Sequence, residues 1–433
     1  MRVRLRYGST GLTLSVPRGA TVLQPTRTPP LADPGGAVRA ALALVDPARL
    51  RPGRGGRRRA AIVVADVTRL MPNAVVLGPL LDLLAQHGLD RDDVTLVIAT
   101  GLHRASRPAE RERILGPLLA RRYRVVDHVA RDPATLAYLG TTARGTRVEI
   151  NRDYLEADVR VLTGFVEPHL FAGYSGGGKA VLPGIASAAA VLANHGADMI
   201  GHPQATFCVT AGNPIFEEIR EVALHSEPAL VVNVTLDERR RLTGVFAGDL
   251  VAAHDAAIAQ AARQARQPVP HRFDVVVATN MGYPADLVLY QSVKGLALAR
   301  LCCEPGGAIL LCAECREGVG GAEYEALLRS HRAPAALLRR LRRAPRTIID
   351  QWQVQIQAQV QTEHEVHLYS ALPPRVVEEA HLRYAADPSA ALAAIIADRR
   401  DALGREPRVC VLPHGQLTVP VVAAGAGASP RPA

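Results

Sequence analysis

Uninterrupted apolar runs, each followed by a polar cluster, recur along the first part of this chain. The runs 60–65, 94–99 and 159–163 match strands that are buried on both faces of a parallel sheet. The segments between them predict helices at 75–87 and 108–121. Strands that alternate with helices are typical of an α/β protein. We expect two α/β domains with mixed sheets flanked by helices, and an active site in the interdomain cleft.

A second series of strands and helices begins after residue 268. Its strands are predicted at 273–278, 308–312, 353–360, 366–369 and 408–412. Because 433 residues are too many for one compact core, we expect an N-terminal domain over 1–268 and a C-terminal domain over 269–404. The segment 267–270 has the composition of a linker, and the segment 405–422 could return to the first domain. The Ala/Gly/Pro-rich tail, 423–433, is expected to be disordered.

The stretch 164–201 combines a glycine loop with candidate chemistry. From Gly173 to Gly178, just before Lys179, it reads GYSGGG, with four glycines in six residues. Glycines let the backbone approach a ligand closely and expose N–H donors to it. The stretch then turns apolar and alanine-rich, which predicts a helix after the loop.

Lysine is almost absent from this basic chain. Of 51 Lys and Arg residues, only Lys179 and Lys294 are lysine. A buried lysine can lose its proton and act as a nucleophile, whereas arginine effectively never does. Both lysines are therefore candidates for chemistry that arginine cannot perform.

Polar side chains follow the predicted buried strands. Asp66, Thr68 and Arg69 follow the first strand, His103 follows the second and His169 follows the third. Ligands of open α/β sheets bind at the carboxyl ends of strands, and histidine can take and return a proton near neutral pH. These side chains are therefore candidate site residues.

The other histidines carry less information. His195 lies sixteen residues beyond Lys179, which is no standard zinc spacing. A single imidazole can nevertheless ligate a metal that other donors hold. Histidines such as His128 and His254 have no special sequence setting, and we expect them to be ordinary core or surface residues.

Two alternatives of another class arise from the loop and the charge. The sequence from Gly173 to Lys179 nearly matches a P-loop, but Ala180 stands where the magnesium-binding hydroxyl belongs. The net charge of +10 could suit a basic nucleic-acid-binding protein. The arginines are spread along the chain without interleaved aromatics, so no nucleic-acid partner is expected.

Cysteine content and hydropathy indicate the compartment. Six cysteines are too few for a disulfide framework in a chain of this length, and the role of the Cys312/Cys315 pair stays open. The N-terminus lacks a signal peptide's apolar core, and no apolar run reaches the roughly 18 residues of a membrane span. We expect a cytoplasmic protein without a membrane partner.

Taken together, these residues resemble the nickel-pincer-nucleotide-dependent lactate racemase family. The likeness covers most of the chain and rests on blocks that occur in the family's order. They are DVTR at 66–69, TGLHR around His103, EPHLFAGYSGGGKAVLPG with His169 and Lys179, ANH at His195, and YQSVKG with Gln291 and Lys294.

The resemblance implies an isomerase, a racemase or epimerase that inverts C2 of a lactate-like 2-hydroxy acid. It implies a nickel-pincer nucleotide, Ni(II)-pyridinium-3,5-bisthiocarboxylate mononucleotide, attached covalently at Lys179, with His195 as a metal ligand. His103 and His169 would be the paired acid/bases. The other implied roles are cofactor binding by Asp66, Thr68 and Arg69, and substrate binding by Arg69, Tyr290, Gln291, Lys294 and Trp352.

The chemistry of inversion agrees with these roles. A hydride must leave C2 while the hydroxyl proton is removed, and both must return to the opposite face of the planar 2-keto acid. One base on each side of the substrate meets this need, and Lys294 or Arg69 suits the carboxylate. The metal and pyridinium supply the hydride acceptor, and domain closure would exclude water.

The expected partners are a small 2-hydroxy acid and the biosynthetic enzymes that load the cofactor. Lactate, malate, a larger hydroxy acid and a sugar acid all stay open as substrates. The oligomeric state is also open.

Overall fold

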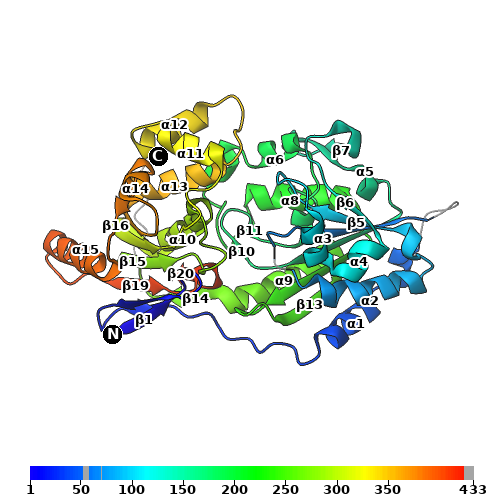
Figure 1. The fold of residues 1–433 in the computed structure, drawn as a ribbon, viewed down its shortest axis with the longest axis horizontal. Helices are drawn as coiled ribbons and strands as arrows, with labels where there is room; N and C mark the ends of the chain where they lie inside the picture. Colours follow the sequence, from blue (N-terminus) through cyan, green and yellow to red (C-terminus); the bar gives the residue numbers. More distant parts are fainter. Residues whose placement is uncertain (52–57, 70, 424–433) are drawn as a thin grey trace. The chain divides into compact units, whose positions relative to one another are not determined.

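A computed structural model describes residues 1–51, 58–69 and 71–423 of the chain (Figure 1). Of the tail predicted at 423–433, residue 423 is described, and residues 424–433 lie outside the described residues. Every helix within the described ranges is too short or too polar to cross a membrane.

The chain divides into two compact units. The unit that we call the N-terminal unit comprises Arg27–His195 and Val209–Ala262. The C-terminal unit comprises Met1–Thr26, Gly196–Cys208 and the chain from Arg263 onward. Two short segments from the first half of the sequence therefore belong to the C-terminal unit. The range expected for the C-terminal domain, 269–404, does not contain them.

A six-stranded sheet forms the centre of the N-terminal unit. Its order is β13 (Leu242–Gly248), β12 (Leu230–Leu236), β9 (Val159–Phe165), β4 (Ala60–Ala65), β5 (Val94–Ala99) and β6 (Arg124–Asp127). All neighbours are parallel except β12 and β13. The predicted apolar runs are thus central strands, and β9, β4 and β5 lie side by side.

The N-terminal unit also contains α1 (Pro34–Ala43), α2 (Asn73–Gln86), α3 (Pro108–Leu115), α4 (Pro117–Arg122), α5 (Arg152–Leu155), α6 (Ala188–Asn194), α8 (Pro214–His225) and most of α9 (Leu250–Ala265). Some of these helices pack apolar side chains against the sheet. Leu77 and Leu80 of α2, for example, share one buried cluster with Ile62 of β4.

The single helix predicted at 108–121 is wrong, because two helices occupy this segment. Gly116, at φ 81°, ends α3, and Pro117 is the first residue of α4. Glycine adopts a positive φ without strain, and proline is favoured in a first helical turn.

A second six-stranded sheet forms the centre of the C-terminal unit, and its strands are all parallel. Its order is β18 (Arg383–Tyr384), β17 (Glu365–Tyr369), β16 (Cys303–Cys312), β15 (Phe273–Thr279), β19 (Val409–Leu412) and β3 (Thr21–Val22). The late strand β19 therefore pairs within the C-terminal unit. An antiparallel hairpin of β1 (Arg2–Leu5) and β2 (Leu12–Ser15) packs into the same core.

The helices of the C-terminal unit include one that we expected to be a strand. They are α7 (Ala197–Gly201), α10 (Leu289–Cys302), α11 (Ala322–Arg329), α12 (Pro334–Arg343), α13 (Gln351–Glu363), α14 (Pro374–Glu379) and α15 (Pro388–Leu403).

The strand prediction at 353–360 is wrong because this segment lies within the helix α13, whose glutamines are mostly buried. Glutamines alternate with apolar residues there and so imitate the two-residue period of a strand. In the helix these glutamines bind backbone carbonyls of neighbouring segments. Gln353 donates to the Tyr290 carbonyl at 2.6 Å, and Gln357 donates to the Ala380 carbonyl at 3.0 Å. Satisfied amides can be buried at little cost.

The linker prediction at 267–270 is also wrong. Residues Arg266–Val269 form β14, which pairs in parallel with β20 (Val419–Val422) in a two-stranded sheet. Pro268 is tolerated there because proline is compatible with the edge of a sheet.

We predict that Asp286 anchors the N-terminal hairpin within the C-terminal unit. Its buried Oδ2 accepts hydrogen bonds from the amides of Gly8, at 2.8 Å, and Glu314, at 3.1 Å. Asp286→Ala should lower the free energy of unfolding by roughly 2–4 kcal/mol, because both amides lose their acceptor. Urea denaturation checks this, and Asp286→Asn, which keeps an oxygen acceptor, should lose less. Equal losses in the two variants would contradict the assignment.

Candidate active site

Asp66 and His103 form a directly bonded pair at the carboxyl ends of β4 and β5. The His103 Nδ1 lies 2.8 Å from Oδ2 of Asp66. The other carboxylate oxygen accepts hydrogen bonds from the Thr68 amide at 3.2 Å and the Thr68 hydroxyl at 2.6 Å. The Asp66 side chain is 7% exposed, whereas that of His103 is 60% exposed. A buried carboxylate therefore orients an accessible imidazole.

The environment keeps Asp66 charged. Burial alone would raise its pKa, but hydrogen bonds from His103 and Thr68, with the positive charges of His103 and Arg69, hold the pKa of the carboxyl below its ordinary value. A carboxylate only accepts, so the neutral His103 carries its proton on Nδ1 and its basic nitrogen is Nε2. Thr68 and Arg69 themselves are exposed.

One phenyl ring holds the other three candidate residues of the N-terminal unit together. Phe171 meets His169 edge-on with ring centroids 4.6 Å apart, and it meets His195 in the same way at 5.0 Å. The Lys179 Nζ lies 5.7 Å from the centroid of this ring. The sequence separates these residues by up to 26 positions, and the fold gathers them around Phe171.

The buried side chain of His169 is held by a backbone hydrogen bond. His169 belongs to β10 (Pro168–His169), and its Nδ1 accepts a hydrogen bond from the Ala172 amide at 3.3 Å. In its neutral form this imidazole therefore carries its proton on Nε2.

His195 caps the carboxyl end of α6 and is held neutral. Burial, followed by the positive charge of Lys179, lowers its pKa to about 3. A neutral imidazole is the form that ligates metals. The structure thus presents His195 in a state that suits a metal donor.

The glycines of the loop face the protein interior. At Gly177, where φ is 49°, an added Cβ would lie 2.2 Å from Nδ1 of His254. The Gly177 amide donates to Oδ1 of Asn233 at 3.0 Å. The expectation that these glycines expose N–H groups to a ligand is therefore wrong at Gly177, because its amide is satisfied within the protein.

The geometry around Lys179 differs from that of a P-loop. The lysine lies in a four-residue 3₁₀ turn, η4 (Gly177–Ala180), and Pro183 follows shortly after. A P-loop lysine stands at the start of a longer helix whose N-terminus faces the phosphates. The turn lies against β4 and β9 instead.

The candidate residues of the C-terminal unit lie on α10 and α13. The Trp352 indole donates to the Tyr290 hydroxyl at 3.2 Å, so the two aromatic side chains are brought together. Gln291 and Lys294 are three positions apart on α10, which places them on one face of the helix. Asn280, at the end of β15, donates to the Gln291 carbonyl at 2.8 Å and ties this helix to the sheet.

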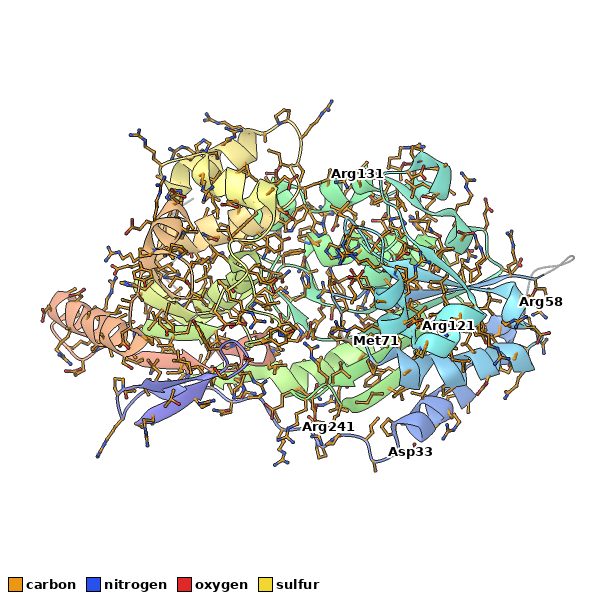
Figure 2. All side chains as sticks on the ribbon, viewed as in Figure 1. Asp33, Arg58, Met71, Arg121, Arg131 and Arg241 are labelled. Carbon is orange, nitrogen blue, oxygen red and sulfur yellow. The ribbon has the colours of Figure 1, made fainter. Side chains whose placement is uncertain are left out.

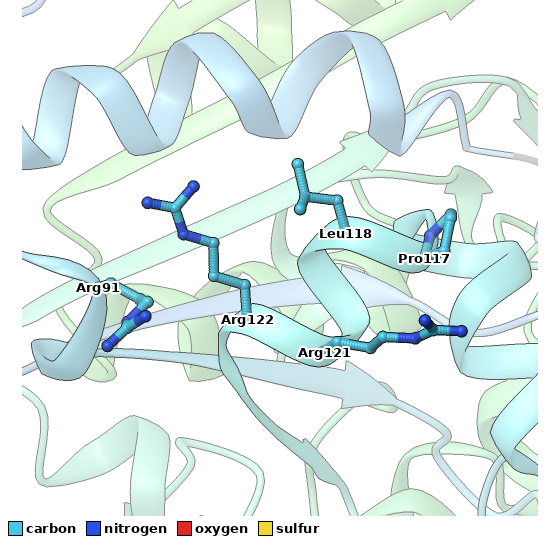
Figure 3. Close-up of a pocket in the computed structure, with 5 residues that line it drawn as sticks. All are labelled: Arg91, Pro117, Leu118, Arg121 and Arg122. Atoms are coloured by element: carbon cyan, nitrogen blue, oxygen red, sulfur yellow. The ribbon is translucent and has the colours of Figure 1, made fainter.

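A separate pocket in the N-terminal unit has different chemistry. Figure 3 shows this cavity, of about 500 Å³, which is lined by Arg91, Pro117, Leu118, Arg121 and Arg122. Carboxylates already pair with two of its arginines, since Glu112 lies 2.9 Å from Arg121 and Asp92 lies 3.1 Å from Arg91. Its lining carries no group that exchanges protons near neutral pH, so we do not place the active site there.

Arginines project from many elements of the N-terminal unit. Figure 2 shows Arg58, Arg121, Arg131 and Arg241 on well-separated parts of it.

Comparisons with known proteins address the family. Residues 7–207 match the lactate racemase N-terminal domain, and residues 269–421 match the lactate racemase C-terminal domain. The chain is 34% identical over 301 residues to the lactate racemase of Thermoanaerobacterium thermosaccharolyticum, which covers 68% of this chain and 70% of that protein. It is also 34% identical over 325 residues to the lactate racemase of Lactiplantibacillus plantarum, covering 74% and 76%. The chain belongs to the lactate racemase family. It is therefore an enzyme of the isomerase class.

Solved structures agree with this membership. The lactate racemase apoprotein from T. thermosaccharolyticum matches with a TM-score of 0.88 and 28% identity over 98% of this chain and 100% of that one. A protein from Thermotoga maritima, 18% identical, shares the fold with a TM-score of 0.67 over 92% and 100% of the two chains. The predicted family and α/β fold are confirmed.

The structure adds three side chains that contact the candidate residues or the turn of Lys179. Phe171 lies within the long glycine-containing block, but nothing in the block marks it as the ring that gathers the others. Asn233 is a polar residue within the mostly apolar β12, whereas His254 lies in a helix with several other polar residues and has no such signal.

We predict that buried histidines make this protein sensitive to mild acid. Burial lowers the pKa of His128 and of His254 to about 4, from an ordinary 6.5. Below pH 6.5 the unfolded chain takes up protons that the folded chain refuses until about pH 4. The free energy of unfolding should therefore fall over this window, by up to about 1.4 kcal/mol per pH unit for each histidine.

Urea denaturation between pH 7 and pH 4.5 measures this slope. His128→Gln should make the slope shallower by the contribution of one histidine, up to about 1.4 kcal/mol per pH unit. An unchanged slope in that variant would argue against a neutral buried His128.

Proposed function

We propose that this isomerase inverts C2 of a lactate-like 2-hydroxy acid, using a nickel-pincer nucleotide attached to Lys179. The observation that carries the proposal is the cluster of Lys179, His169 and His195 around the Phe171 ring. The relatives named lactate racemase support the choice of substrate class.

The residues present fit this cofactor. Lys179 offers an amine for the covalent thioamide link, and the neutral His195 offers a metal donor beside the same phenyl ring. Exposed Thr68 and Arg69 would hold the nucleotide part. The bound group would supply the hydride acceptor that no side chain offers.

Two histidines would handle the substrate hydroxyl proton. The His103 Nε2 accepts it, and the imidazolium that forms is stabilised by the charged Asp66. For the opposite enantiomer His169 takes the corresponding role, which requires its Nδ1 to release the 3.3 Å contact with the Ala172 amide. Asp66 bonds His103 and Thr68 through its two oxygens, so we assign it the orientation of His103 in addition to its expected place beside the cofactor.

Substrate binding would draw on both cations and aromatic side chains. Lys294 or Arg69 would hold the carboxylate, and Gln291 would add a hydrogen bond. The bonded pair of Tyr290 and Trp352 would form a fixed aromatic wall that limits the size of the C2 substituent.

We predict that Lys179 carries the cofactor. Protein produced together with the cofactor's biosynthetic enzymes should gain a nucleotide-sized adduct by intact mass and one nickel by metal analysis. Lys179→Ala should carry neither, whereas His195→Ala should keep the adduct and lose nickel. The T. thermosaccharolyticum lactate racemase, loaded in parallel, is the positive control. An unmodified wild-type chain beside a loaded control would overturn the proposal.

Substrate choice is tested on the loaded enzyme. A panel of enantiopure lactate, malate, larger 2-hydroxy acids and sugar acids, followed by chiral chromatography, should show the highest kcat/KM with lactate-like acids. A preference for malate or a sugar acid would overturn the proposed lactate-like substrate, but the assignment to the isomerase class would stand.

We predict that Asp66→Asn impairs proton transfer. The amide would present a donor to His103 Nδ1 and so favour the wrong tautomer. In the loaded enzyme kcat should fall roughly 10²–10⁴-fold, with KM changed less than about threefold. Asp127→Asn is the matched control, because Asp127 is equally buried but pairs with Arg111 rather than a candidate histidine. A similar loss in both variants would show that Asp66 acts only through stability.

A further inference from the structure

Three buried polar side chains, those of Ser175, Asn233 and His254, form hydrogen bonds with the backbone just before and within the turn of Lys179. The Ser175 hydroxyl donates to the Phe165 carbonyl at 2.9 Å and accepts from the Glu167 amide at 2.9 Å. Asn233 Oδ1 accepts from the Gly177 amide at 3.0 Å, and His254 Nε2 lies 3.0 Å from the Ser175 carbonyl oxygen. These side chains come from the loop itself, from β12 and from α9.

His254 has one possible hydrogen-bonding state in this position. A carbonyl oxygen only accepts, so Nε2 of His254 carries the proton and donates. Burial lowers its pKa to about 4, which keeps the ring neutral at physiological pH. The ring stacks on Phe216 with centroids 5.9 Å apart, which fixes its plane.

The His254 ring also packs directly against Gly177. An added Cβ at Gly177 would lie 2.2 Å from His254 Nδ1, and one at Gly178 would lie 2.9 Å from the Ile219 carbonyl oxygen. The turn therefore cannot move closer to α8 and α9. The hydrogen bond of Gly177 to Asn233, and that of the preceding Ser175 carbonyl to His254, oppose movement in the other direction. Lys179 is the next residue along this constrained backbone.

We propose that His254 is a positioning residue for Lys179, which it serves by holding the Ser175 carbonyl and by filling the space behind Gly177. The turn then presents the lysine amine in one orientation to the group that it binds. This inference rests on the proposed function of Lys179 as the cofactor anchor.

The chain offers a matched control for His254. His128 is also buried and neutral, and its Nε2 donates to a backbone carbonyl, that of Ala186, at 2.9 Å. Leucine at either position removes the donor and destabilises the fold, whereas glutamine keeps an N–H donor at a similar reach. His254→Asn is a second variant if leucine prevents folding, because its shorter amide does not reach Ser175.

Cofactor loading of the folded full-length protein is the first measurement. The rate of adduct formation at Lys179, followed by intact mass, should fall about tenfold in His254→Leu or His254→Asn, the effect of losing one orienting hydrogen bond. His254→Gln should restore it, and His128→Leu should load as wild type does for an equal amount of folded protein. Equal loading in the two leucine variants, or no rescue by glutamine, would overturn the proposal.

A second measurement needs no cofactor and separates this proposal from the proposed function. Lys179 and Lys294 are the two side-chain amines of the chain, so acetylation of the apoprotein by an N-hydroxysuccinimide ester, read on peptides, gives their ratio directly. That ratio should shift in His254→Leu or His254→Asn and stay at the wild-type value in His254→Gln and His128→Leu. If the wild type takes no adduct while His254→Leu and His254→Asn still shift the ratio, the cofactor role is refuted and the positioning role is kept. An unchanged ratio would refute the positioning role.

Discussion

Close packing of the glycine turn against the interior of its own unit is the constraint on which the candidate site depends. Side chains at Gly177 and Gly178 would overlap His254 and the Ile219 carbonyl, so the backbone there is as close to α8 and α9 as it can be. That approach fixes the start of the segment that carries Lys179. A separate contact fixes Phe171, whose carbonyl accepts from Asn213 at 2.9 Å, and hence the ring that His169 and His195 contact.

The order of strands supplies the other half of the site. Parallel strands present their carboxyl ends at one edge of a sheet, and β4 and β5 are neighbours in this one. Residues 37 positions apart, Asp66 and His103, therefore meet without any specialised loop. The same edge receives the segment that follows β9, which leads to His169. Hydrogen bonds between strands thus place the acid/base candidates, and side-chain packing places the lysine.

Much of this could be read from the sequence, and the exceptions share a cause. Buried strands and the polar residues after them are local patterns, so the sheet and the places of Asp66, His103 and His169 were predictable. The helix α13 was not, because its buried glutamines are satisfied by carbonyls of other segments, such as those of Tyr290 and Ala380. The contact of His254 was not readable for the same reason, since its partner Ser175 is 79 positions away. Local pattern does not show which polar side chains tertiary contacts will satisfy.

The histidines show how environment divides one residue type among different tasks. His103 is accessible and bonded to a charged carboxylate, which orients its ring and leaves Nε2 to face a substrate. His195 and His254 are buried, and burial lowers the pKa of each far below 6.5. Such rings do not exchange protons near neutral pH, and they are suited to constant roles as a donor to a metal or to a carbonyl. The contrast arises from solvent exposure and one aspartate, so moving a carboxylate next to His254 would favour its charged form and put a proton on the nitrogen that packs against Gly177.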